Sequence, residues 1–200
     1  MIDLVKYSKK NKFFEFLIIN IFKINIHKLD KTFFFKKNLD LGFNDFFFYD
    51  YMKKNPYTKW SSDLANHHYQ SNHDLQKLND FKKPIIEIEN FLNKEVKYKI
   101  FNSKVFGKFR VKSIWFTIQK NNQGHSKHNH PKSILSGVYY FKGDYNKGGE
   151  IEIFNNDKII EHKPLKNDII IFNSNIYHSV KPYYGQNDRI AIAWDAIYTF

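Results

Sequence analysis

Three closely spaced histidines, His125, His128 and His130, precede residues 134–141, an apolar stretch typical of a buried strand. Imidazole nitrogens are common ligands of iron, zinc and copper. His128 and His130 are two residues apart, and side chains at that spacing lie on the same face of an extended segment. We therefore predict that both side chains can bind one metal ion, with a further ligand from elsewhere in the chain. The alternative is a polar turn whose histidines bind no metal.

His178 is the candidate for the further ligand. It follows an expected strand at residues 168–172 and a short loop at residues 173–177. Two ligands from one segment and a third from a later strand can bind a metal on one face, which leaves other coordination positions open. This arrangement is that of non-haem Fe(II) oxygenases.

Arg189 is a candidate for binding an anionic cosubstrate. The chain has two arginines, Arg110 and Arg189, beside thirty lysines. Arg189 comes eleven residues after His178 and opens the last expected strand. A buried guanidinium at that position could hold a dicarboxylate through its planar pair of donors. An ordinary surface ion pair with Asp188 is the alternative.

The C-terminal half has the pattern of an all-β core. Short apolar or alternating stretches are separated by turn sequences rich in Asn and Gly, and no helical pattern lies between them. The expected strands are residues 109–119, 134–141, 149–154, 158–162, 168–172, 177–181 and 189–198. Regularly spaced short strands of this kind favour a jelly roll, the double-stranded β-helix.

We expect the N-terminal part, residues 1–108, to form a helical or mixed flank that packs on the β core of residues 109–200. The two parts form one structural domain, which is mainly β and belongs to the α+β class because of its helical flank. Residues 84–96 have Pro84 at the start and apolar residues at three- and four-residue steps, which predicts an amphipathic helix. Residues 30–60 show no clean period.

Two other N-terminal stretches contain candidate functional features. In residues 61–80, His67, His68 and His73 occur beside Asp63 and Asp74, and we interpret them as exposed polar residues around short helices rather than as a second metal site. Residues 6–22 resemble the basic and apolar parts of a signal peptide, but Glu15 interrupts the apolar run and no small-residue cleavage site follows. The apolar run is also too short to span a membrane. We expect a cytoplasmic protein without a membrane span, with export as the alternative.

Composition narrows the functional classes further. The chain has no cysteine, which excludes disulfides, thiolate metal sites and a cysteine nucleophile. The formal net charge is +12, yet residues 121–200 carry nine basic and eight acidic side chains, so the excess lies in the first 120 residues as scattered lysines. Because no block of like charge occurs and arginine is rare, a solvated basic surface is favoured over a nucleic-acid site.

The ordered motifs resemble the Fe(II)- and 2-oxoglutarate-dependent oxygenase superfamily over residues 111–196. The resemblance is closest to a group of largely uncharacterised bacterial and phage-type oxygenases with the pattern Gly-x-x-x-His-x-His-Pro followed by Ser-Gly-Val-Tyr-Tyr. Here those motifs are residues 124–131 and 136–140, with Trp115 upstream. They are followed by Gly148-Gly-Glu-Ile-Glu-Ile153, Pro164, Asp168-Ile-Ile-Ile-Phe172, His178-Ser-Val-Lys-Pro182 and Arg189-Ile-Ala-Ile-Ala-Trp194.

The resemblance implies a role for each residue of the site. His128 and His178 would be Fe(II) ligands, and Arg189 would pair with the distal carboxylate of 2-oxoglutarate. Tyr140 would hydrogen-bond the same carboxylate, with Tyr139 in its place if the strand register differs by one residue. The superfamily usually has His-x-Asp or His-x-Glu, whereas this chain has His130 as the second ligand, or else a remote carboxylate.

The implied activity is that of a dioxygenase that uses O2 and hydroxylates an unidentified substrate, releasing succinate and CO2. No catalytic residue beyond the metal ligands is required. A cupin-type metalloenzyme without 2-oxoglutarate is one alternative; cupins usually place a glutamate about four residues after the His-x-His pair, where this chain has Ser133, Ile134 and Leu135. A non-enzymatic basic module that binds nucleic acid or an acidic partner is the other. The substrate and the oligomeric state stay open.

Overall fold

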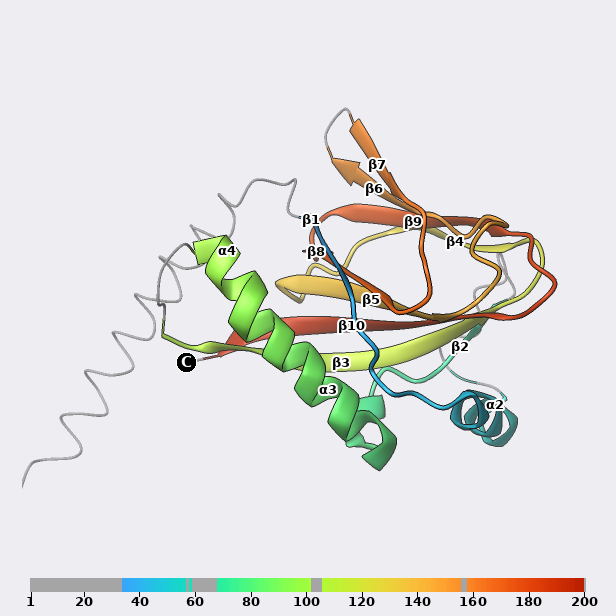
Figure 1. The fold of residues 1–200 in the computed structure, drawn as a ribbon, viewed down its shortest axis with the longest axis horizontal. Coiled ribbons are helices and arrows are strands. Elements are labelled where there is room, and N and C mark those ends of the chain that lie inside the picture. Colours follow the sequence, from blue (N-terminus) through green and yellow to red (C-terminus); the bar gives the residue numbers. More distant parts are fainter. Residues whose placement is uncertain (1–33, 57, 59–67, 102–105, 156–157, 200) are drawn as a thin grey trace, which may run out of the picture.

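Two antiparallel sheets form the centre of the molecule in the computed structural model, which describes residues 34–56, 58, 68–101, 106–155 and 158–199 (Figure 1). The larger sheet has the strand order β1-β8-β5-β10-β3-β2 and the smaller sheet β4-β9-β6-β7. The strands of the larger sheet are β1 (Phe34–Asn38), β2 (Tyr69–Gln70), β3 (Lys108–Gln119), β5 (Leu135–Lys142), β8 (Asp168–Asn173) and β10 (Arg189–Thr199). Those of the smaller sheet are β4 (Gln123–His128), β6 (Ile151–Asn155), β7 (Lys158–His162) and β9 (Tyr177–Tyr183).

Alternation along the strands of the larger sheet supplies two separate cores. Tyr139, Ile169 and Ile192 face the helices. Tyr140, Ile170 and Ala191, each next to one of them in sequence, face the smaller sheet. All six residues of β8 are buried, because this strand is covered on both faces. A strand buried on both sides reads as a continuous apolar run, which is the pattern Ile169 to Phe172.

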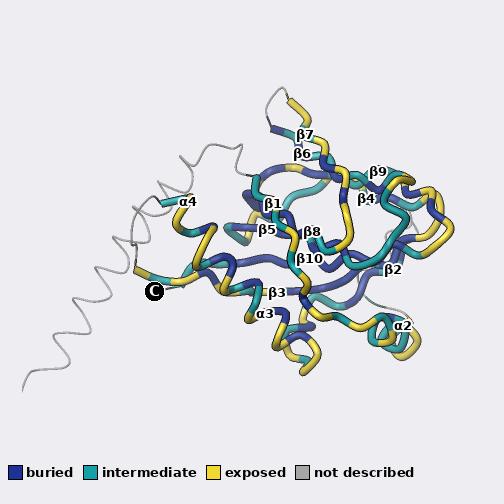
Figure 2. Tube along the Cα trace, viewed as in Figure 1, coloured by how far each residue is buried: buried dark blue, intermediate teal, exposed yellow. Residues whose placement is uncertain are grey.

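Helices cover the outer face of the larger sheet (Figure 1). They are α2 (Asp45–Lys54), α3 (Asn79–Phe91), a π-helical turn at Leu92–Val96 and α4 (Lys97–Phe101), with a 3₁₀ turn at Leu75–Lys77 before α3. Figure 2 shows buried backbone where α3 meets the sheet and exposed backbone on the opposite side. This amphipathic arrangement agrees with the three- and four-residue spacing of the apolar side chains.

The prediction of a helix over residues 84–96 was wrong about where the helix begins, because it placed Pro84 at the start. Helix α3 begins at Asn79, so Pro84 lies inside it and is buried. The proline removes one backbone hydrogen bond within the helix. The missing hydrogen bond costs stability at this turn of the helix, while Phe81, Ile88 and Phe91 of the same helix are buried in the core.

The expected C-terminal strands are all present with small changes of boundary, and the mainly β jelly roll is confirmed. Three strands were not expected. β1 comes from the region with no clean period and pairs with β8, whereas β2 comes from residues 61–80 and pairs with β3. β4 contains His125 and His128, in a polar sequence without strand-forming residues.

One prediction, the signal-like stretch at residues 6–22, lies outside the described residues. Within the described residues, no helix is long and apolar enough to cross a membrane.

Candidate metal centre

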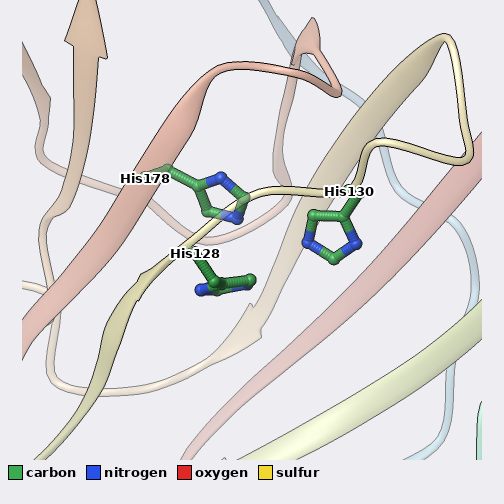
Figure 3. A group of neighbouring side chains, drawn as sticks. All are labelled: His128, His130 and His178. Atoms are coloured by element: carbon green, nitrogen blue, oxygen red, sulfur yellow. The ribbon is translucent and has the colours of Figure 1, made fainter.

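His128, His130 and His178 come together at one end of the space between the two sheets (Figure 3). One ring nitrogen of each residue lies within 4.8 Å of a ring nitrogen of the other two. The ring centroids of His128 and His178 are 4.2 Å apart, and those of His128 and His130 are 5.0 Å apart. Three neutral nitrogen donors at this separation can bind one transition-metal ion.

Strand pairing explains the position of two of the three histidines. His128 ends β4 and His178 is the second residue of β9, and the two are direct partners in the antiparallel pairing. The pairing of β4 with β9 is irregular around His125, which is typical of strand ends next to a site.

The third histidine is positioned differently from what the sequence suggested. His130 lies beyond the end of β4, so its approach to His128 does not come from the alternation of a strand. Its backbone N–H donates to the carbonyl oxygen of Ser174 at 2.8 Å, which ties the segment to the loop before β9. The geometry agrees with the prediction that His128 and His130 can share one site, although β4 ends before His130.

Hydrogen bonds at Nδ1 leave the other nitrogen of each histidine available. The Nδ1 atoms of His128 and His178 lie 2.8 and 3.2 Å from the backbone oxygens of Ser126 and Ile176. A carbonyl oxygen can only accept, so each Nδ1 carries the proton. His130 Nδ1 lies 3.1 Å from Asp195 Oδ2. This pattern orients metal-binding imidazoles and leaves Nε2 unprotonated for the metal.

His128 and His178 are held in the neutral form that binds metals. Burial, and after it the neighbouring His125, lower the pKa of His128 to about 4. Burial, followed by the proximity of His128 and His130, places the pKa of His178 well below its usual value. Because protons compete poorly for these nitrogens at neutral pH, the site is ready for a cation.

Two other histidines lie beside the three. The ring of His125 is 4.3 Å from that of His128, yet His125 is not part of the group that converges on one point. His68 is 2% exposed and packs against His125, which contradicts the interpretation of residues 61–80 as exposed polar residues. His67 and Asp63 lie outside the described residues.

Arg189 lines the same pocket as the three histidines and is 2% exposed. Its guanidinium donates to Gln119 Oε1 and, at 3.1 Å, to the backbone oxygen of Gly149, both of them neutral acceptors. Its Nε is buried without a hydrogen-bond partner among the described residues. Burial lowers its pKa, although a guanidinium stays charged. The alternative of a surface ion pair with Asp188 was wrong.

Tyr140 supplies a second unsatisfied polar group near Arg189. Its hydroxyl is buried with no hydrogen-bond partner in the described part of the chain, and its ring centroid is 5.3 Å from the guanidinium carbon. Tyr139 faces the other way, where its hydroxyl donates to Asn167 Oδ1 at 2.7 Å. A buried cation with neutral partners and a free hydroxyl fit the carboxylate of a dicarboxylic acid.

The pocket extends along strand β10. Arg189, Ala191 and Ala193 alternate with core residues and line the pocket, whose volume is about 60 Å³, and Asp195 continues the same face of the strand into the adjoining groove. Six residues of extended strand span about 20 Å. The two alanines leave space between the cationic end at Arg189 and the end occupied by the histidines.

Asp195 and Gln119 are site residues that the sequence reasoning missed. Asp195 contacts His130, and Gln119 holds Arg189. The alternation Arg-Ile-Ala-Ile-Ala-Trp-Asp at residues 189–195 was the available signal, because it places positions 189 and 195 on one face.

A second, larger groove of about 490 Å³ adjoins the pocket and shares four lining residues with it, Trp115, His125, His128 and His130. One wall is a stack of rings in which His73 lies 4.2 Å from Trp115 at an interplanar angle of 12°. Lys112 and Lys132 line the groove as well, with Lys112 Nζ 3.1 Å from the backbone oxygen of Lys132.

Comparison with known proteins agrees with this geometry. Residues 113–163 match the family model described as "Putative 2OG-Fe(II) oxygenase". The match includes the histidine motif and the Ser-Gly-Val-Tyr-Tyr strand, and it ends before His178 and Arg189. No curated protein matches the chain.

Solved structures show the same fold. A prolyl-4-hydroxylase from Pseudomonas putida is 12% identical with a TM-score of 0.59, covering 87% of this chain and 97% of that one. A viral collagen prolyl hydroxylase from Paramecium bursaria Chlorella virus-1, solved as a 2OG complex, is 17% identical with a TM-score of 0.59, covering 84% and 98%. A 2OG-Fe(II) oxygenase family oxidoreductase from Burkholderia pseudomallei is 12% identical with a TM-score of 0.53, covering 88% and 89%.

The fold is therefore the double-stranded β-helix of the 2-oxoglutarate oxygenases. Together with the family-model match, it supports the 2OG-Fe(II) oxygenase superfamily and an oxidoreductase. That family implies Fe(II) and 2-oxoglutarate, and the three histidines could bind the iron.

Proposed function

We propose that the protein is an Fe(II)- and 2-oxoglutarate-dependent dioxygenase that hydroxylates a substrate with release of succinate and CO2. One observation carries the proposal: a single pocket holds three converging histidines and a buried arginine whose partners are neutral oxygens. A metalloenzyme that uses no dicarboxylate has no need of such an arginine. The motif spanning residues 124–131 and 136–140 supports the same assignment.

His128, His130 and His178 would hold Fe(II), and Arg189 with Tyr140 would hold the distal carboxylate of 2-oxoglutarate. When bound, the iron and the cosubstrate supply the oxidising power for hydroxylation by O2. The chain orients both groups. Val138, Ile151 and Phe172 give the pocket an apolar wall, which excludes water and strengthens the pairing of carboxylate with guanidinium.

The groove beside the histidines is the proposed route of the substrate. It opens on the metal side of the pocket, and Gln70 and His73 bring the N-terminal part of the chain into its wall. Lysine side chains and the imidazole–indole stack provide donors and a flat apolar surface. Selection of the substrate by the N-terminal flank is therefore part of the proposal.

An anaerobic titration tests this function. Metal-free protein is titrated with Fe(II) and then with 2-oxoglutarate, and the visible metal-to-ligand charge-transfer band is recorded. We expect the band in the parent protein, its loss in His178→Ala and a shift to much higher 2-oxoglutarate concentration in Arg189→Ala. Removing a buried charged partner should weaken binding by at least about thirtyfold.

Arg110→Ala is the matched control for the arginine. Arg110 pairs with Glu89 on the helical side of the larger sheet and should leave the band unchanged. Iron binding without a band in the parent would contradict the use of 2-oxoglutarate and favour a cupin-type metalloenzyme. Absence of iron binding would contradict the metal centre itself.

A further inference from the structure

The proposed donor set differs in charge from the usual two-histidine, one-carboxylate arrangement. Replacing the carboxylate ligand by His130 removes one negative charge from the centre. Fe(II) would then sit among neutral ligands in a partly buried site, where an uncompensated charge is costly. The structure contains a carboxylate in contact with that same histidine.

Asp195 lies behind His130 and is 8% exposed. Its Oδ2 is 3.1 Å from His130 Nδ1, and its Oδ1 accepts from Ser136 Oγ at 2.6 Å. Each carboxylate oxygen therefore has a donor on a different element, so the side chain is held in one orientation. The remaining nitrogen of His130 is left for the metal.

A break in strand pairing accompanies this position. The pairing of β10 with β3 shifts register between Asp195 and Ala196, which pair with Ser113 and Val111, so Lys112 forms a bulge on β3 opposite the aspartate. Bulges next to active sites redirect side chains. Along β10, Arg189 and Asp195 then place a cation and an anion on the same face, six residues apart.

We propose that Asp195 is a positioning residue that supplies, through His130, the negative charge that the three-histidine centre lacks. The inference rests on the proposed function for the identity of the ligands. A carboxylate that accepts from the distal nitrogen of a ligating imidazole fixes the ring and raises its basicity. The centre then has the same net charge as one with a direct carboxylate ligand.

The test compares Co(II) binding by the parent and by Asp195→Asn, which keeps the shape and an acceptor oxygen but removes the charge. Co(II) is stable in air and its visible spectrum reports the ligand set. We expect the affinity of Asp195→Asn to fall about tenfold to a hundredfold, as for other groups that support metal ligands. Asp50→Asn removes a charge of the same sign from the surface of α2 and should bind Co(II) as the parent does.

A second pair of variants separates charge from structure. His130→Asp restores a carboxylate among the ligands, which makes Asp195 unnecessary and places two like charges side by side. In that background Asp195→Asn should leave the Co(II) affinity unchanged or raise it, the reverse of its effect in the parent. Ser136→Ala keeps the charge of Asp195, so its loss of affinity should be smaller than that of Asp195→Asn.

Equal Co(II) binding by parent and Asp195→Asn would overturn the inference while leaving the metal centre in place. An equal loss in the His130→Asp background would overturn it too, because Asp195 would then act on the fold rather than through His130. Melting temperatures of the metal-free variants show whether each folds, and Asp195→Glu provides a second variant that keeps the charge. Failure of the parent to bind Co(II) would instead remove the metal centre and both proposals.

Discussion

Tyr139 and Tyr140 show how much adjacent residues of the same type can differ. Both are buried, but only Tyr139 has a hydrogen-bond partner for its hydroxyl, Asn167 Oδ1. The hydroxyl of Tyr140 has none in the described structure and faces the pocket that contains Arg189. A buried hydroxyl without a partner costs stability, so its presence indicates a partner that arrives with a ligand.

Replacing these tyrosines by phenylalanine should therefore have opposite effects. Tyr140→Phe removes an unsatisfied group, so the free energy of unfolding of the metal-free protein should stay the same or rise by up to about 1 kcal/mol. Its affinity for 2-oxoglutarate, measured with Fe(II) present, should fall about tenfold to a hundredfold, since a hydrogen bond to a carboxylate is lost.

Tyr139→Phe serves as the control for this pair. It should lower the free energy of unfolding by about 1 kcal/mol, because Asn167 loses its donor, and it should leave the 2-oxoglutarate affinity unchanged. A loss of cosubstrate binding in Tyr139→Phe rather than Tyr140→Phe would mean that the assigned register of β5 does not describe the site.

At the scale of elements, the turn before β6 supports the arginine. Gly149 has φ +77°, and a Cβ atom there would lie 2.8 Å from Arg189 Nε. The absence of a side chain lets the backbone carbonyl of Gly149 accept from the guanidinium at 3.1 Å. Glycine is thus required at this position for backbone conformation and for close approach.

Gly149→Ala should lower both stability and cosubstrate binding. We expect about 1–2 kcal/mol less free energy of unfolding from the left-handed backbone, and weaker 2-oxoglutarate binding because the guanidinium is displaced. Gly42→Ala is the matched control, since Gly42 has φ +69° but its nearest neighbour to a Cβ is Lys83 Nζ at 3.9 Å.

Denaturant unfolding and a 2-oxoglutarate titration of both variants check this prediction. Gly42→Ala should show the stability loss alone. Equal cosubstrate affinity in Gly149→Ala and the parent would show that Arg189 does not depend on the turn.

At the scale of the whole molecule, the metal-free protein contains several histidines that resist protonation. Burial lowers the pKa of His73 and of His128 to about 4, and it lowers the pKa values of His162 and His178 as well. In the unfolded chain these groups titrate near their ordinary value of about 6.5. Between pH 6.5 and about 4 the unfolded chain therefore binds more protons than the folded one.

The metal-free protein should become less stable as the pH falls through that range. Each such histidine adds up to about 1.4 kcal/mol per pH unit to the slope of the free energy of unfolding against pH. This slope disappears above pH 6.5. Urea unfolding in the presence of a chelator, compared at pH 7.5 and pH 5.5, measures the slope. His162→Asn lies outside the metal centre and should reduce the slope by its own share. Greater stability at pH 5.5 would contradict the burial of neutral histidines.

Local sequence patterns determined the C-terminal fold and the identity of most of the site. The resemblance selected Tyr140, with Tyr139 as the alternative, and the structure places Tyr140 and Arg189 in the pocket on alternating positions of β5 and β10. Turn sequences placed the strand boundaries within a few residues. The jelly roll followed from the spacing of the strands and is confirmed. Fe(II) and 2-oxoglutarate followed from the resemblance; the family-model match implies the same cofactors, and the three histidines could bind the iron.

Only the tertiary structure decided how the metal centre is completed. His130 is placed by a hydrogen bond to Ser174, and Asp195 reaches it from the position in β10 that lies opposite a bulge in β3. β4 gains its strand conformation by pairing with β9, although its own sequence is polar. Pairing between segments far apart in the chain depends on hydrogen bonds and burial that leave no local pattern. The sequence thus determined which residues could act, and long-range contacts decided which of them meet.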